Sequence, residues 1–279
     1  MRGLDHRALV DALLPPVLAA GRLQLGYFRS GMAVERKADQ SPVTAADRES
    51  EAILVAALER IAPRTIIAAE EAVAEGRVPP AAGEMFLVDP LDGTRDFVSG
   101  SDDFTVNVGL VRDGRPVLGL ILAPARGEIY ATLGAGIAAM ARLDHSAALE
   151  IGPGTLSWTP IAARRADDAG LVAVSSPWRP QQPIDDWLAG RRVRSKLFAG
   201  SSYKFCLIAR GDGDVYPQPG ATYEWDTAAG QAILEAAGGR VLTREGAPLG
   251  YGKAAAGYLN PPFIAWGRDD AGPPSATDC

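Results

Sequence analysis

The seven residues 88–94, VDPLDGT, carry the strongest local signal in this sequence. They follow the apolar run MFLV at 85–88, which predicts a strand that delivers Asp89 at its carboxyl end. Asp92 returns three residues later, so both carboxylates can serve one cluster of cations. The Leu91 carbonyl between them can point inward as a further oxygen ligand. Magnesium prefers such an oxygen-only set.

Gly93 and Thr94 complete the motif on the side where a phosphate would lie. Gly93 lets the backbone approach an anion closely, and Thr94 can begin a helix whose N–H groups face that anion. The alternative interpretation is an ordinary Asp-rich turn, because Asp-Gly is common turn chemistry. The local motif alone leaves both interpretations open.

Two more acidic positions favour a metal cluster. Glu70-Glu71 follows the apolar strand predicted at 65–69, and Asp226 opens a predicted helix at 225–237. A lone acid at a helix start usually compensates the helix dipole, so Asp226 taken alone is ambiguous. Three acid placements, each at the end of a regular element, favour two magnesium ions roughly 4 Å apart, which could activate water and stabilise a leaving oxygen.

Scarce residues exclude several other chemistries. The chain has 279 residues and a net charge of −6, with two histidines and two cysteines. Zinc sites rich in histidine and triads with a histidine base are therefore not expected. Aspartyl-phosphate phosphatases need D-x-D-x-T, whereas these acids are spaced D-x-x-D. The cysteine phosphatase signature fails because Asp212 stands where the arginine after Cys206 should be.

The rest of the chain reads as one mixed α/β unit of two lobes. We expect an N-terminal α+β lobe over 1–143, a C-terminal α/β lobe over 144–266 that completes the active site, and a disordered tail over 267–279. A helix from Thr44, with Thr44 and Asp47 as a capping box, is predicted to end before Pro63.

Composition also limits partners and location. No Lys/Arg stripe accompanies the negative net charge, so a nucleic-acid polymer is not expected as a partner. We expect no membrane span, since no stretch approaches about 18 uncharged apolar residues. The amphipathic N-terminus does not read as a secretion signal, so the cytoplasm is the expected location. The sequence leaves monomer and homodimer open.

Six motifs carry a family resemblance. Three resemble those of the inositol monophosphatase superfamily: VDPLDGT at 88–94, the pair Glu70-Glu71, and WDTAAG at 225–230. Three longer matches are more specifically similar to its bacterial CysQ-like branch, the 3′(2′),5′-bisphosphate nucleotidases: KADQSPVTAAD at 37–47, GSSYKFCLIARG at 200–211, and EWDTAAGQAIL at 224–234. The resemblance spans about residues 30–240.

The resemblance implies a fold and a set of roles. The fold would be a layered αβαβα sandwich of two lobes, like inositol monophosphatase and fructose-1,6-bisphosphatase, with the active site between the lobes. Two or three Mg²⁺ ions would be held by one group of oxygen donors: Glu70, Asp89, the Leu91 carbonyl, Asp92 and Asp226. Thr94, hydrogen-bonded to Asp47, would orient the attacking water, although Asp47 can also be a simple capping acid. Glu71 would reach a third metal through water, or lie exposed.

The resemblance also implies a substrate and its contacts. The substrate would be adenosine 3′,5′-bisphosphate, a small phosphorylated molecule cleaved to AMP, with inhibition by lithium and a place in sulfur metabolism. Its expected contacts are Gly93, Thr94, Gly200, Ser201 and Lys204.

The loop at 29–46 would act as a lid carrying Lys37. The branch usually has an arginine where this chain has Gln218, and a neutral amide makes no charge-assisted bond to phosphate. An inositol or sugar monophosphatase is the alternative enzyme. A non-catalytic metal- or phosphate-binding protein is the alternative of another class.

Overall fold

The segments with strand periodicity form two sheets in the computed structural model, which describes residues 5–30, 35–36, 42–143 and 156–268. The first sheet has seven strands in sequential order: β3 (Ile66–Ala69), β4 (Glu84–Asp92), β5 (Thr105–Arg112), β6 (Arg115–Ala123), β7 (Glu128–Gly134), β8 (Ile137–Arg142) and β9 (Thr159–Pro160). β3 and β4 are parallel, and the other neighbouring pairs are antiparallel. Short turns join β5 to β6, β6 to β7 and β7 to β8, whereas α4 lies between β4 and β5.

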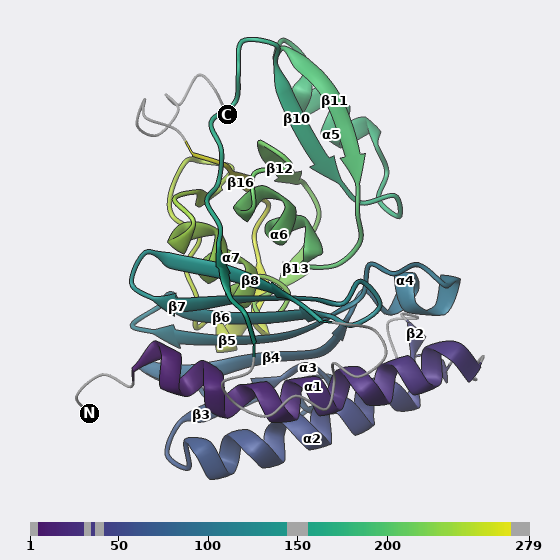
Figure 1. Ribbon diagram of the computed structural model, residues 1–279, viewed down its shortest axis with the longest axis vertical. Coiled ribbons are helices and arrows are strands. Elements are labelled where there is room, and N and C mark those ends of the chain that lie inside the picture. The colour runs from purple at the N-terminus through teal and green to yellow at the C-terminus, as the bar shows by residue number, and fades with distance from the viewer. Residues whose placement is uncertain (1–4, 31–34, 37–41, 144–155, 269–279) are drawn as a thin grey trace.

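Two long helices cover one face of this sheet, α1 (His6–Ser30) and α2 (Ala45–Ile61) (Figure 1). Their apolar faces and the inward side chains of the strands form one core cluster. The stretch His6–Phe28 has the length and hydropathy of a membrane span. Half of that stretch is buried inside the protein, and a helix that packs on a protein core passes the same test, so the packing favours a core helix.

The other face of the first sheet receives α7 (Ala228–Ala236), with α6 (Tyr203–Ala209) beside it. Gly109 and Gly119 are paired across β5 and β6, directly under the start of α7. A β-carbon at Gly119 would lie 2.1 Å from the Ala229 carbonyl oxygen, and one at Gly109 would lie 2.7 Å from Ala228 Cβ. The two glycines therefore let the helix backbone rest directly on the sheet.

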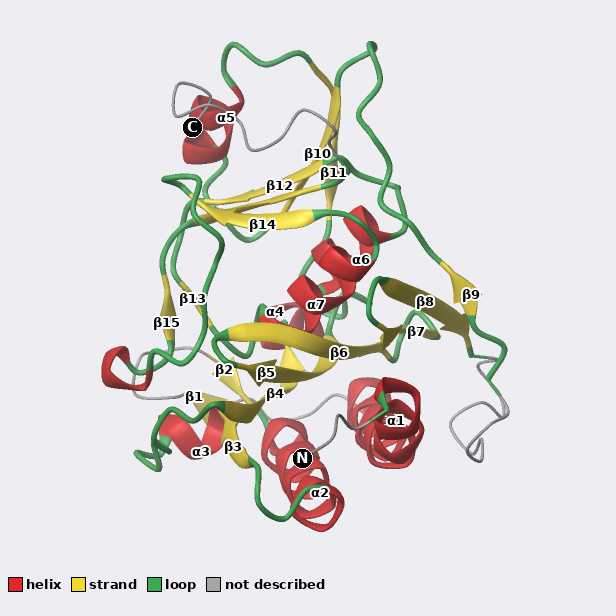
Figure 2. Ribbon diagram, turned by 90° about the vertical axis from the view of Figure 1, so that its left-hand side faces the viewer, coloured by secondary structure: helices red, strands yellow, loops and turns green. Residues whose placement is uncertain are grey.

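The second sheet lies beyond α6 and α7 (Figure 2). Its strand order is β11 (Val193–Phe198), β10 (Leu171–Ser175), β12 (Val215–Gln218), β16 (Phe263–Trp266) and β14 (Arg240–Thr243). α5 (Gln182–Leu188) packs on its outer face through Ile184 and Leu188. The layers therefore run α1/α2, first sheet, α6/α7, second sheet and α5, which confirms the expected αβαβα sandwich.

Three short helices and two two-stranded ribbons complete the described elements. The helices are α3 (Glu70–Ala74), α4 (Thr94–Ser99) and a 3₁₀ turn (Ala254–Ala256). The ribbons pair β1 (Glu35–Arg36) with β2 (Pro42–Val43) and β13 (Thr222–Tyr223) with β15 (Leu259–Asn260). Half of the predicted lid, including Lys37, and most of the predicted tail lie outside the described residues. β9 pairs with β8, so part of the predicted second lobe completes the first sheet.

Candidate functional site

The site begins at the carboxyl end of β4, where the strand departs from regular pairing. Asp89 is opposite Asn107 and Asp92 is opposite Thr105, with a register shift between the two pairs. Between these pairs, Pro90 and Leu91 of β4 face the single residue Val106 of β5, and this bulge turns both acids toward the same corner. The Asp89 carboxylate accepts the Leu91 N–H at 3.0 Å, which fixes the turn.

Gly93 and Thr94 lie at the start of α4, as the motif predicts. Gly93 has a left-handed backbone with φ of 88°, and Thr94 is the first helical residue. The Thr94 hydroxyl lies 3.2 Å from Asp47 Oδ1 and 3.4 Å from the Leu91 carbonyl oxygen. Thr94 thus lies beside both the capping acid of α2 and the carbonyl of the Asp89–Asp92 turn.

Asp47 both caps α2 and contacts Thr94. Its Oδ2 accepts bonds from the Thr44 N–H at 2.7 Å and the Thr44 hydroxyl at 2.6 Å, which is the predicted cap of α2. Its Oδ1 remains available to Thr94. Asp47 is only 1% exposed, so the helix cap holds this carboxylate in a fixed position under the site.

Glu70 reaches the same corner through the parallel pairing of β3 and β4. Ala69 is opposite Val88, so Glu70, the first residue after β3, comes level with Asp89 in β4. Glu51 of α2 accepts the backbone N–H groups of Glu71 and Ala72 at 2.7 and 2.8 Å and so anchors the first turn of α3. Burial raises the pKa of Glu51 to about 7.

Asp226 comes from the opposite lobe and lies in the turn before α7. The helix begins at Ala228 and not at the predicted Trp225, because residues 223–227 form a separate turn. In that turn the Asp226 carboxylate accepts the Tyr223 N–H at 2.8 Å. The position at a helix entrance was correctly predicted, whereas the helix start was three residues too early.

Electrostatics shows that the four acids lie close together. Burial raises the pKa of Asp89, and the charges of Glu70, Asp92 and Asp226 raise it further. Burial also raises the pKa of Asp226, with Asp92 and Glu70 as the next causes. The charges of Glu70 and Asp92 therefore act on both Asp89 and Asp226, although Glu70 and Asp226 are far apart in the sequence.

The donor set fits a hard divalent cation in chemical type. Among the described residues, no three Asp, Glu, His or Cys side chains are already converged as ligands of one ion. The available donors are nevertheless all carboxylate or carbonyl oxygens, the ligands that magnesium prefers. A cation at this corner would also relieve the repulsion that raises the pKa values of Asp89 and Asp226.

Asp92 links the two lobes. Its Oδ2 accepts bonds from the Ser202 N–H at 2.5 Å, the Ser202 hydroxyl at 2.6 Å and Asn107 Nδ2 at 3.2 Å. Ser202 precedes α6, so this carboxylate joins the end of β4 to the loop that carries the predicted Ser201.

That loop holds the remaining predicted contacts. The Gly200 N–H donates to Asp103 at 2.9 Å, and Ser201 has a left-handed backbone with φ of 48°. Lys204 is 5% exposed, and its Nζ donates to the Ser201 carbonyl and lies 5.1 Å from the centre of the Tyr216 ring. Burial lowers the pKa of Lys204. The lysine is thus held inside the site, not solvated on a helix face.

A cavity of about 300 Å³ contains most of the predicted residues. Its lining includes seven of them: Glu70, Asp92, Gly93, Thr94, Ser201, Lys204 and Asp226. Asp89 is buried in the same strand as Asp92. The structure therefore brings the predicted metal, water-orienting and substrate groups into one place.

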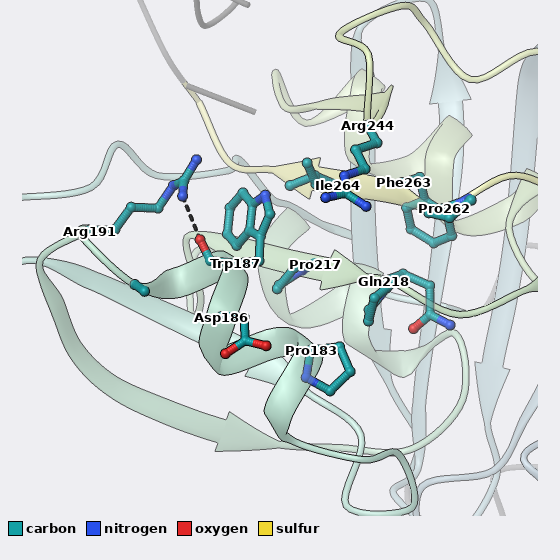
Figure 3. A pocket seen from close by; sticks show the side chains of 12 residues that line it. Pro183, Asp186, Trp187, Arg191, Pro217, Gln218, Arg244, Pro262, Phe263 and Ile264 are labelled. Atoms are coloured by element: carbon teal, nitrogen blue, oxygen red, sulfur yellow. Dashed lines mark hydrogen bonds between the residues drawn. The ribbon is translucent and has the colours of Figure 1, made fainter. Parts of the chain in front are cut away.

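A second cavity, of about 370 Å³, lies on the other side of Gln218 (Figure 3). Its lining is rich in proline and aromatic rings, with Trp187 and Phe263 prominent, and includes a single carboxylate, that of Asp186. Arg191 stacks on Trp187 with its guanidinium carbon 4.0 Å from the ring centre. One acid cannot form an oxygen-rich metal site, so the first cavity is the candidate for chemistry.

Sequence reasoning missed several groups in the site. Glu51, Asn107 and Ser202 position the predicted ligands, while Trp178 and Arg179 line the cavity from the loop after β10. No local pattern marks them, because each acts on a partner distant in the sequence. Ser202 is a partial exception to this absence of a local pattern, since it lies within the motif GSSYK.

Comparison with known proteins agrees with this arrangement. A model of the inositol monophosphatase family matches residues 9–265. The 3′(2′),5′-bisphosphate nucleotidase CysQ of Escherichia coli (strain K12) is 33% identical over 232 residues, which cover 83% of this chain and 88% of that protein. The CysQ protein of Buchnera aphidicola is 30% identical over 262 residues, covering 93% and 94%.

A solved structure leads to the same family. The crystal structure of CysQ from Bacteroides thetaiotaomicron, a bacterial member of the inositol monophosphatase family, has a TM-score of 0.74 and 31% identity. The match covers 96% of this chain and 100% of that one. By its sequence, its layered fold and the acids gathered at the end of β4, this chain belongs to the inositol monophosphatase family and is similar to its CysQ members.

Proposed function

We propose that this protein is a magnesium-dependent phosphomonoesterase that hydrolyses the 3′-phosphate of adenosine 3′,5′-bisphosphate to AMP and phosphate, and that it acts in the cytoplasm. The observation that supports the proposal is geometric: Glu70, Asp92 and Asp226 line one cavity together with Thr94, and Asp89 is buried in the same strand as Asp92. The named activity of the CysQ relatives supports the choice of nucleotide.

The oxygen donors divide between the lobes. Glu70, Asp89, the Leu91 carbonyl and Asp92 would hold Mg²⁺ from the first sheet, and Asp226 would hold it from the loop before α7. When bound, Mg²⁺ polarises the phosphoryl oxygens, favours ionisation of water and stabilises the leaving oxygen. A hydrolysis that uses these donors needs no covalent intermediate on the protein.

Thr94 and Asp47 would position the attacking water. The Asp47 carboxylate can only accept, so at 3.2 Å it draws the Thr94 hydroxyl proton toward itself. The Thr94 oxygen then presents its lone pairs to a water molecule and fixes the orientation of that water. A protein that only binds phosphate has no need of such a pair, which supports an enzyme over the non-catalytic alternative.

The test is phosphate release from adenosine 3′,5′-bisphosphate, inositol 1-phosphate and fructose 1,6-bisphosphate, with and without Mg²⁺ and in the presence of Li⁺. We expect the nucleotide to be preferred, Mg²⁺ to be required and Li⁺ to inhibit. A clear preference for either other substrate would refute the nucleotide assignment and favour a sugar or inositol phosphatase.

Substitution separates enzyme from binding protein. Asp89→Asn should abolish turnover, whereas Asp186→Asn, which removes the carboxylate of the second cavity, should retain it. Phosphate release by Asp89→Asn at the parent rate would contradict the catalytic proposal.

A further inference from the structure

Both ends of the Gln218 carboxamide bond to the protein. Gln218 is 3% exposed; its Oε1 accepts the Tyr216 hydroxyl at 3.0 Å, and its Nε2 donates to the Gly220 carbonyl at 3.2 Å. The amide therefore helps to maintain the turn after β12. This side chain has no charge to offer a ligand, and one of its two N–H donors is already used.

A guanidinium occupies the space beside it. Gly220 has no β-carbon, and this leaves room for the guanidinium of Arg179. A β-carbon at Gly220 would lie 3.0 Å from Arg179 Nη1 and 3.7 Å from Gln218 Nε2. Arg179 Nη2 also donates to the Ala221 carbonyl at 3.2 Å. Arg179, which is 39 positions before Gln218 in the sequence, thus places a permanent positive charge next to the neutral Gln218 amide.

The loop that carries Arg179 is held from two sides. The Gln181 amide donates to the Ser176 and Arg179 carbonyls at 2.9 and 2.8 Å and accepts the Ser175 hydroxyl at 3.1 Å. From the other lobe, Asp96 accepts the Trp178 indole N–H at 2.8 Å. These bonds orient the loop before any ligand arrives, which lowers the entropic cost of binding.

Arg179 and Lys204 both line the active-site cavity, and neither forms an ion pair with a carboxylate in the part of the chain that the structure describes. Burial lowers the pKa of Lys204; the charges of Asp92 and Asp96 oppose this shift, and the charge of Arg179 adds to it. Asp96 lines the cavity together with Glu70, Asp92 and Asp226. One cavity therefore combines carboxylates that can hold metal ions with two cations that can meet an anionic group of a ligand.

We infer that Arg179 is a specificity-determining residue: it binds a second anionic group of the substrate, a phosphate distinct from the one that is hydrolysed, and so selects bisphosphorylated over monophosphorylated substrates. This inference rests on the proposed function and narrows it. A guanidinium can make paired, charge-assisted bonds to a phosphate, and only one of its N–H groups is engaged by the Ala221 carbonyl.

The experiment compares two substrates that differ only in the second phosphate, adenosine 3′,5′-bisphosphate and adenosine 3′-monophosphate. The variant is Arg179→Gln, which keeps polarity and length but removes charge. We expect kcat/KM for the bisphosphate to fall about 10- to 100-fold, mainly through KM, since a charge-assisted pair of bonds to phosphate is lost. The value for the monophosphate should stay within about twofold.

Two further variants sharpen the comparison. Arg179→Lys keeps the charge without the planar fork and should recover part of the loss. Arg244→Gln makes the same charge change in the second cavity, on the far side of Gln218, and should behave as the parent with both substrates. Calorimetric titration should show that the Arg179→Gln protein binds AMP more weakly than the parent does. Its affinity for adenosine, which has no phosphate, should not be weakened.

The outcomes distinguish the two proposals. A parent protein that does not hydrolyse the bisphosphate refutes the proposed function. A parent that hydrolyses it, with Arg179→Gln losing equal activity on both substrates or none on either, refutes only the inference about Arg179. An equal loss in Arg244→Gln would also refute it, because general charge would then explain the effect.

Discussion

Ser202→Ala tests whether one buried hydroxyl holds the two halves of the site together. Ser202 is 2% exposed; its Oγ accepts a bond from Asn107 Nδ2 at 2.9 Å and lies 2.6 Å from Asp92 Oδ2 and 2.5 Å from the Asp226 carbonyl. The hydroxyl has one proton, so it donates to one of these two oxygens at a time. Alanine removes one donated and one accepted bond and leaves the backbone N–H bond to Asp92 intact.

The magnitude follows from these bonds. A bond to a charged carboxylate contributes about 1.5–3 kcal/mol and a neutral one about 0.5–1.5 kcal/mol. Asn107 keeps its contact with Asp92 and Asp92 keeps the backbone donor, so we expect a loss of about 2–3 kcal/mol of unfolding free energy. For a chain of 279 residues that corresponds to a fall in Tm of roughly 3–5 °C.

The assay combines thermal unfolding in EDTA with a magnesium titration of activity. Because Ser202 orients the Asp92 carboxylate, the Mg²⁺ concentration for half activity should rise about tenfold or more. Ser99→Ala is the matched control, since it removes an exposed hydroxyl bonded only to the Asp96 carbonyl and should cost less than about 0.5 kcal/mol. Equal stability and equal magnesium dependence in the two variants would refute the reasoning.

Three other changes should have distinct effects. Gly119→Ala should destabilise the fold by more than about 3 kcal/mol in denaturant unfolding, because its β-carbon would lie 2.1 Å from the Ala229 carbonyl oxygen; a loss below about 1 kcal/mol would contradict that packing. Burial raises the pKa of the Cys206 thiol, so in a Cys279→Ser background the folded protein should not react with a thiol reagent until it is denatured. The pKa of Glu51 is raised from 4.5 to about 7, so between these pH values the folded state keeps a proton that the unfolded chain has lost. The protonated Glu51 therefore contributes stability that is fully present below pH 4.5 and is lost as the pH rises through about 7. In EDTA, Glu51→Gln should remove about 2 kcal/mol from the change in unfolding free energy over this pH range. If the unfolding free energies of parent and variant change with pH in parallel, the raised pKa of Glu51 is contradicted.

Much of the site followed from local rules that depend on neighbouring residues alone. The capping box of Thr44 and Asp47 was predicted because N-cap geometry needs only three or four residues. The placement of Asp89 and Asp92 was predicted because a strand followed by a short turn returns both acids to one corner. The placement of Glu70 and Asp226 at the ends of other regular elements favoured one metal cluster, and the resemblance to a family then implied the same set of ligands.

The tertiary structure alone decided which distant groups meet. Glu51 anchors α3 only because α2 packs beside β3, and Arg179 lies beside Gln218 only because the loop after β10 is braced against Asp96. Such contacts depend on how the layers pack, and the local sequence around a residue does not indicate which distant residues will lie beside it. The sequence indicated that Gln218 lacks a charge; the packing shows a guanidinium placed beside it.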